Sequence, residues 1–189
     1  PVETYMCGGN WSDISPKTVP SLALRTYRDA FRNLVKKGPH KGEERSSSED
    51  RRKCAENFEN HLSSGGKVHG AMLAIHQLVE KYWHMDQEDP VFEAQFRDIV
   101  EKMKGSGSMD YVIPLADVSG SMQGTPIHVS IGIAAVVSKI QDLFGGRYMT
   151  FSTSPSWTII PKEMSLFQIV NTAKRDNNWG GSTNFESAM

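Results

Sequence analysis

The sequence predicts a mixed α/β protein in which an all-helical region precedes a partial, doubly wound α/β domain with a Rossmann-like sheet. Two observations support this prediction. Between residues 22 and 104, apolar side chains recur at steps of three and four residues, which is the helical period. After the Gly and Ser run at 105–108, short apolar stretches alternate with an apolar helix, as in a parallel α/β sheet.

The first region is expected to contain four helices. Residues 1–21 are rich in Gly, Pro, Ser and Trp, and we expect an irregular lead-in there. Ser21 is placed to cap a helix that ends at Gly38, and Pro90 suits the first turn of the last helix. Residues 40–52 have almost no apolar side chains to offset the entropy of ordering, so we expect a mobile loop. The other helices are expected at 51–62, 69–84 and 90–104.

The second region, 108–189, is expected to alternate strands with helices. Residues 111–116 resemble a strand buried on both faces, although Pro114 removes one ladder donor. Helices are expected from Pro126 to about Leu143, and from a Ser165 cap to about Arg175. Two short strands are expected at 147–151 and 157–160, joined by a turn.

Composition narrows the class of protein. The 189 residues are 38% hydrophobic and 23% charged, with no apolar run long enough to cross a bilayer and no secretion signal. The two cysteines lack metal-type spacing, so we expect an intracellular, cytoplasmic protein. Residues 1–53 carry eleven Lys and Arg against seven Asp and Glu, which makes them basic within a chain of net charge −1. Because the chain starts at Pro1 and stops inside a helical turn, we expect a fragment.

One motif follows the first expected strand of the second region. Asp117, Ser119 and Ser121 alternate along a loop that precedes the helix at Pro126. Ligands of open α/β sheets bind beyond the carboxyl ends of strands, and hard oxygen ligands suit Mg²⁺, Mn²⁺ or Ca²⁺. The structural alternative is a Ser and Asp loop that only caps the next helix.

In this context residues 108–189 resemble the first half of a von Willebrand factor A domain. By that resemblance Asp117, Ser119 and Ser121 match the Asp-x-Ser-x-Ser ligands of a metal-ion-dependent adhesion site, and Thr183 matches a threonine from a later loop. Asn184 stands where relatives often have Asp, and a further Asp of the family would lie past residue 189. The resemblance implies a divalent cation, most simply Mg²⁺, that binds an Asp or Glu of a protein partner.

The helical half carries a looser resemblance. Together with the Asp117 motif, short stretches around Val19, Gly70, Gln95 and Trp179 are similar to a family in which helices precede an A domain, a layout shared with Ro/TROVE ribonucleoproteins. That layout implies a component of a larger assembly and keeps RNA binding as the alternative function. Its candidate contacts form a basic series with helical spacing: Arg25, Arg28, Arg32 and Lys36.

Catalysis is not expected. Ser119 stands where a haloacid-dehalogenase-type phosphatase needs its second Asp, and neither a nucleophile elbow nor a phosphate-binding loop occurs. A phosphatase or another hydrolase is the enzymatic alternative. The residues His69, His76 and His84 form no i, i+4 pair, so we expect surface or partly buried histidines in place of a zinc site.

Overall fold

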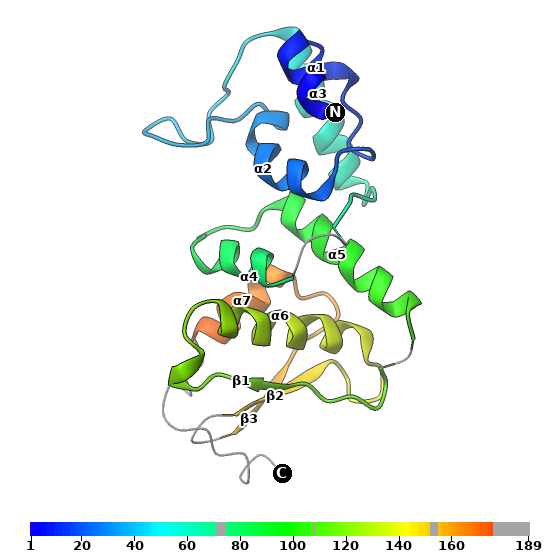
Figure 1. Ribbon diagram of the computed structural model, residues 1–189, viewed down its shortest axis with the longest axis vertical. Helices are drawn as coiled ribbons and strands as arrows, with labels where there is room; N and C mark the ends of the chain where they lie inside the picture. Colours follow the sequence, from blue (N-terminus) through cyan, green and yellow to red (C-terminus); the bar gives the residue numbers. More distant parts are fainter. Residues whose placement is uncertain (71–74, 108, 152–154, 176–189) are drawn as a thin grey trace. The chain divides into compact units, whose positions relative to one another are not determined.

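The computed structural model describes residues 1–70, 75–107, 109–151 and 155–175 (Figure 1). It has two compact units. Unit 1 consists of Pro1–Met72 and Pro90–Asp98, and unit 2 of Leu73–Asp89 and Ile99–Met189. The protein is mixed α/β, with seven α-helices and a three-stranded sheet in the described residues. The two units divide the expected helical region 22–104, because residues 73–89 and 99–104 group with the sheet and not with the preceding helices.

Unit 1 contains helices α1 (Val2–Gly8), α2 (Ser21–Phe31) and α3 (Glu49–Ser63), the 3-10 helix η1 (Trp11–Asp13) and the start of α5 (Pro90–Gly105). The expectation of an irregular lead-in was wrong for residues 2–8 and 11–13, which are helical. Helix α1 ends where Gly9 adopts a φ of 75° and donates its N–H to the carbonyl of Tyr5. That left-handed closure is favourable for glycine, so the glycines of the lead-in end a helix.

The core of unit 1 is formed by apolar residues of α2, α3 and η1. Phe31 and Phe58 are fully buried, and their rings stack with centroids 4.8 Å apart. Asp50, in the first turn of α3, accepts hydrogen bonds from the N–H groups of Trp11 (2.7 Å) and Ser12 (2.9 Å). The guanidinium of Arg51 lies over the Trp11 ring at 3.6 Å. These contacts attach η1 to α3.

Three helix boundaries of the first region differ from the expectation. Helix α2 ends at Phe31 and not at Gly38, because Asn33 takes a φ of 55° and Leu34 then pairs with Glu44. Helix α3 begins at Glu49, inside the expected loop at 40–52. The helix expected from His69 is α4 (Ile75–Trp83); residues 69 and 70 are not helical, and 71–74 lie outside the described residues.

A buried junction joins three segments of unit 1. The side-chain amide of Gln95, which is fully buried on α5, donates hydrogen bonds to the carbonyls of Ser21 (3.0 Å) and His69 (3.2 Å). The N–H of Gly70 donates to a carboxylate oxygen of Asp98 at 2.7 Å. The stretches around Val19, Gly70 and Gln95, which suggested the family resemblance, therefore lie at this junction or directly beside it.

Unit 2 is built on a sheet of order β1-β2-β3. Strands β1 (Leu115–Asp117) and β2 (Arg147–Phe151) are parallel, and β3 (Ser156–Ile159) is antiparallel to β2. Helix α6 (Thr125–Ile140) connects β1 to β2, as a parallel crossover requires. Helix α7 (Leu166–Arg175) follows β3; Ser165 and Gln168 cap it reciprocally, which confirms the predicted cap.

Helix α6 covers one face of this sheet (Figure 1). The side chains on that face are buried: Ala116, Tyr148 and Thr150. Leu115, Trp157 and Ile159 belong to the opposite face and are 42%, 50% and 59% exposed. The predicted strand at 111–116 was therefore too long and not buried on both faces. Its ladder with β2 begins at the carbonyl of Pro114, which accepts the N–H of Met149.

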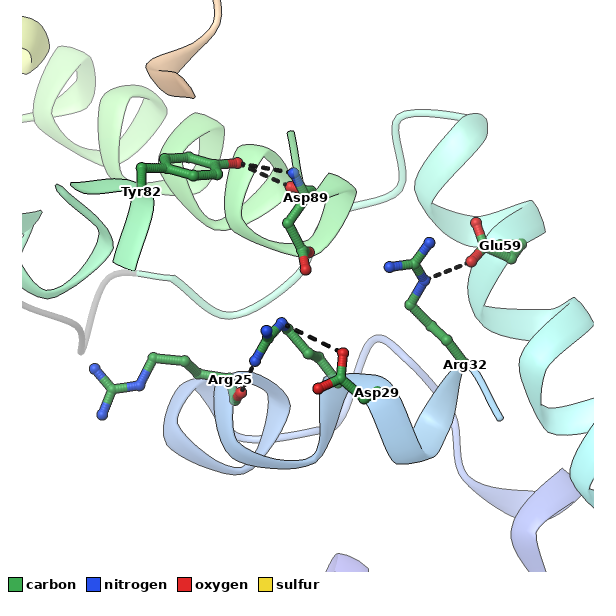
Figure 2. Close-up of polar contacts among 7 residues, drawn as sticks. Arg25, Asp29, Arg32, Glu59, Tyr82 and Asp89 are labelled. Atoms are coloured by element: carbon green, nitrogen blue, oxygen red, sulfur yellow. Dashed lines mark hydrogen bonds and ion pairs between the residues drawn. The ribbon is translucent and has the colours of Figure 1, made fainter. Parts of the chain in front are cut away.

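Helix α4 packs on α6 and α7. Leu78, Val79 and Tyr82 of α4 are fully buried. The hydroxyl of Tyr82 donates to the carbonyl of Asp89 at 3.0 Å and lies 3.3 Å from the N–H of Asp89, so it closes the turn after α4 (Figure 2). None of the helices in the described part of the chain combines the length and apolar character needed to cross a bilayer.

Candidate functional site

The candidate site is the loop between β1 and α6. Asp117 is the last residue of β1, and one of its carboxylate oxygens accepts the N–H of Ser119 at 2.9 Å. The hydroxyl oxygens of Ser119 and Ser121 are 3.2 Å apart. Residues 120–122 form a single 3-10 turn, η2 (Gly120–Met122), which brings Ser121 back toward Ser119. The structure thus brings three of the four predicted ligands together; Thr183 and its neighbour Asn184 lie outside the described residues.

Burial of the loop is uneven. Val118 and Ser119 are 1% and 3% exposed and anchor the loop against the unit, whereas Ser121 is exposed and Asp117 is half-buried. The loop is therefore anchored through Val118 and Ser119, while the side chain of Ser121 stays accessible. The oxygen atoms that converge here belong to one carboxylate and two hydroxyls, which are hard donors of low total charge.

The alternative role for Asp117, Ser119 and Ser121 is to cap helix α6. Gly124 is the N-cap of α6, and no side chain caps that helix by a hydrogen bond. Pro126 in the first turn removes one of the N–H groups that would need a cap. The oxygen atoms of Asp117, Ser119 and Ser121 therefore do not serve to cap α6.

Other types of metal site are not indicated. In the residues that the structure describes, no group of three or more His, Cys, Asp or Glu side chains is placed to hold a metal ion. His69 and His84 are exposed and His76 is half-buried, as expected.

Cys7 is exposed and Cys54 is buried, and both are free thiols. Burial raises the pKa of the Cys54 thiol to about 11, so this thiol is not a reactive nucleophile at neutral pH.

The basic series predicted on one helix is interrupted. Arg32 donates to Glu59 of α3 at 2.5 Å (Figure 2). Arg28 lies over the ring of Phe92 at 4.7 Å, contacts Asp29 at 3.7 Å and donates to the carbonyl of Arg25. Lys36 lies past the end of α2, so the prediction that it continues the same helix was wrong. Two of the three arginines of the series, Arg28 and Arg32, thus already bind protein groups.

A histidine that the sequence analysis missed lies just after the loop. His128, in the first turns of α6, is 7% exposed and packs its ring against Trp83 of α4 at 5.0 Å. Burial lowers its pKa; Glu80 opposes this shift, and His84 and His76 add to it. The sequence signal that could have predicted the burial of His128 is its position within an otherwise apolar helix.

This burial predicts acid sensitivity. Because the folded-state pKa of His128 lies below the ordinary value near 6.5, its stabilising contribution is complete above about pH 6.5 and is lost as pH falls through the folded-state pKa. Melting temperatures at pH 7.5 and 5.5 should differ less in His128→Gln than in the parent. His69→Gln, at an exposed position, is the control and should retain the parent's difference. An undiminished difference in His128→Gln would contradict the prediction.

Comparison with known proteins gives two similarities. Residues 111–189 match the profile of a domain of unknown function, DUF7788. The whole chain is 29% identical over 190 residues to the uncharacterized protein L728 of Acanthamoeba polyphaga mimivirus and covers 32% of it. The chain therefore spans about a third of the length of this curated relative. No solved structure matches the chain significantly. The profile match starts just before β1, and so it includes the Asp117 loop, α6 and Thr183.

Proposed function

We propose that unit 2 contains the first part of a von Willebrand factor A-type, doubly wound domain and that the loop after β1 binds a divalent cation, which in turn binds an acidic group of a protein partner. The observation that supports this most is the convergence of Asp117, Ser119 and Ser121 at the carboxyl end of a parallel strand. That end of a strand is where open α/β sheets bind ligands.

The topology is consistent with this domain type. Strand β1 is joined to β2 by a helical crossover, and β3 returns antiparallel at the outer edge, as in doubly wound sheets that carry one antiparallel strand. In the described residues β1 has a neighbour on one side only. Further parallel strands would pair with its other side and would bring additional ligands to the same end of the sheet.

The chemistry of the loop favours binding over catalysis. Ser119 and Ser121 supply neutral hydroxyl oxygens and Asp117 supplies one negative charge, so a bound Mg²⁺ would keep a net positive charge. Thr183 would add another neutral oxygen by the family resemblance. A carboxylate from Asp or Glu of a partner is the complementary ligand for such a centre. The layout that the helical half resembles belongs to components of larger assemblies, so we place this interaction within such an assembly.

The cation site is tested by measuring the melting temperature of the chain at increasing concentrations of Mg²⁺ or Mn²⁺. At a free cation concentration of about one hundred times the dissociation constant, native-state binding adds about 2.7 kcal/mol to the free energy of unfolding. We expect the melting temperature of the parent to rise with the cation concentration and to return to its starting value when a chelator is added. The melting temperature of Asp117→Ala should not change with cation.

The control variant is Asp86→Ala, which removes another carboxylate of unit 2, exposed and outside the loop. It should respond to cation as the parent does. A chain extended past residue 189 should respond more strongly if further strands supply ligands. If Asp117→Ala melts with the same cation dependence as the parent, or if neither the chain nor its extended form responds, the cation site is wrong.

A further inference from the structure

The segment that follows α2 forms a hairpin fixed by its backbone. Leu34 and Glu44 make an antiparallel bridge. The N–H groups of Val35 and Gly42 donate to the carbonyls of Glu43 and Val35, each at 2.9 Å, and that of Arg45 donates to Asn33 at 2.7 Å. We call residues 33–46 the basic hairpin; Figure 1 shows it extending away from α2 and α3.

Asn33 anchors the base of the basic hairpin. It is 3% exposed, has a φ of 55° and donates its side-chain amide to the carbonyl of Ser46 at 2.7 Å and to Glu44 at 3.3 Å. Asparagine is one of the few residues that adopt this left-handed conformation readily. The N–H of Leu34 donates to the carbonyl of Asp29, which joins the base to α2.

The outer part of the basic hairpin carries free positive charge. Residues 36–45 are all exposed. Its two carboxylates are engaged, since Glu43 contacts His40 at 3.1 Å and Glu44 binds the guanidinium of Arg52. Within the described ranges, no carboxylate lies at ion-pair distance from the lysine ammonium groups of the hairpin. These lysines are Lys36, Lys37 and Lys41.

Hydrophobic burial does not account for the order of this segment, because residues 36–46 contain no apolar side chain apart from Pro39. The order comes from the backbone bonds and from Asn33, and it holds three lysines on one exposed turn. A fixed arrangement of like charges binds a polyanion at a smaller entropic cost than a flexible one.

The shape and composition favour one kind of polyanion. Single-stranded nucleic acids are bound largely by aromatic stacking, and the basic hairpin has no aromatic side chain of the Phe, Tyr or Trp type. Its turn, which includes Gly38, Pro39 and Gly42, offers no apolar wedge for a membrane. The major groove of B-form DNA admits a two-stranded ribbon, whereas that of A-form RNA is too narrow.

We propose that the basic hairpin binds double-stranded DNA, with Lys36, Lys37 and Lys41 contacting backbone phosphates independently of base sequence. Lysine suits this contact as a point charge, and phosphate contacts carry no sequence information. The basic hairpin belongs to unit 1 and the Asp117 loop to unit 2, and DNA binding by the hairpin needs no divalent cation.

The test is fluorescence anisotropy of a labelled 20-base-pair random duplex titrated with the 189-residue chain between 50 and 200 mM salt, in chelator. We expect the chain to bind the duplex. The logarithm of the association constant should fall with the logarithm of the salt concentration with a slope of about −3, as three phosphate contacts predict. A triple variant, Lys36→Gln, Lys37→Gln and Lys41→Gln, should lose about tenfold or more in affinity at low salt and most of that slope.

The matched control removes the same charge elsewhere, as Lys17→Gln, Lys53→Gln and Lys81→Gln, all at exposed positions. It should bind the duplex within about twofold of the parent. Circular dichroism establishes that both triple variants are folded. The proposal is overturned if the two variants lose affinity equally, if the parent does not bind the duplex at 50 mM salt, or if single-stranded RNA or phosphatidylserine vesicles bind more tightly than the duplex.

Discussion

Replacing Phe58 by alanine should lower the free energy of unfolding of unit 1 by about 3–5 kcal/mol, the usual range for removing a buried phenylalanine side chain. Phe58 is fully buried on α3, and its ring stacks on that of Phe31 of α2 with an interplanar angle of 10°. Truncation removes the stacking contact and leaves a cavity between the two helices.

Urea unfolding followed by tryptophan fluorescence measures this effect in unit 1. Trp11 is the one tryptophan of the sequence that falls in unit 1, and it is 9% exposed. Variants with phenylalanine in place of the other three tryptophans make the signal specific. Leu22→Ala, at a side chain of α2 that is 59% exposed, is the control and should change the stability of unit 1 by less than about 0.5 kcal/mol. A loss below 1 kcal/mol in Phe58→Ala would show that the Phe31 and Phe58 contact does not hold α2 to α3.

The sequence predicts the elements whose signals are local. Helix α5 begins at Pro90 and β2 spans 147–151, both as expected. Ser165 caps α7 by accepting the N–H of Gln168, three residues further along the chain. Each of these depends on residues within a few positions of one another. The Asp117 loop belongs to the same class, because the three ligands predicted in it lie within five residues and one turn brings them together.

The misplaced boundaries depend on distant residues. Apolar periodicity continues past Phe31, but the left-handed Asn33 and its bonds to Ser46 divert the chain into the basic hairpin. Composition alone also does not indicate this hairpin, because residues 36–46 pair through their backbone groups and not through buried side chains. Likewise, the partner of Arg32 is 27 residues away, so helical spacing alone could not show that the basic series is engaged.

Gly70→Ala should destabilise unit 1 by about 3 kcal/mol, at the upper end of the usual cost of overpacking. An added Cβ would fall on the carbonyl oxygen of Gln95 and within 2.9 Å of its carbonyl carbon and Cα. These are backbone atoms of a helix, so they cannot move aside as a flexible side chain can. The segment at residue 70 would have to shift, which would strain the bond from Gly70 to Asp98.

The same shift would weaken the bond that Gln95 donates to the carbonyl of His69, so one methyl group would disturb two of the contacts that fix the junction. Gly105→Ala, at the last residue of α5, is the matched control because its Cβ would meet nothing within 4 Å. That variant should be neutral or slightly more stable, since alanine favours helix more than glycine does. Equal urea midpoints for the two variants would mean that residue 70 does not pack against α5. A loss confined to Gly70→Ala would show that residue 70 packs against the backbone of α5 too closely to admit a side chain.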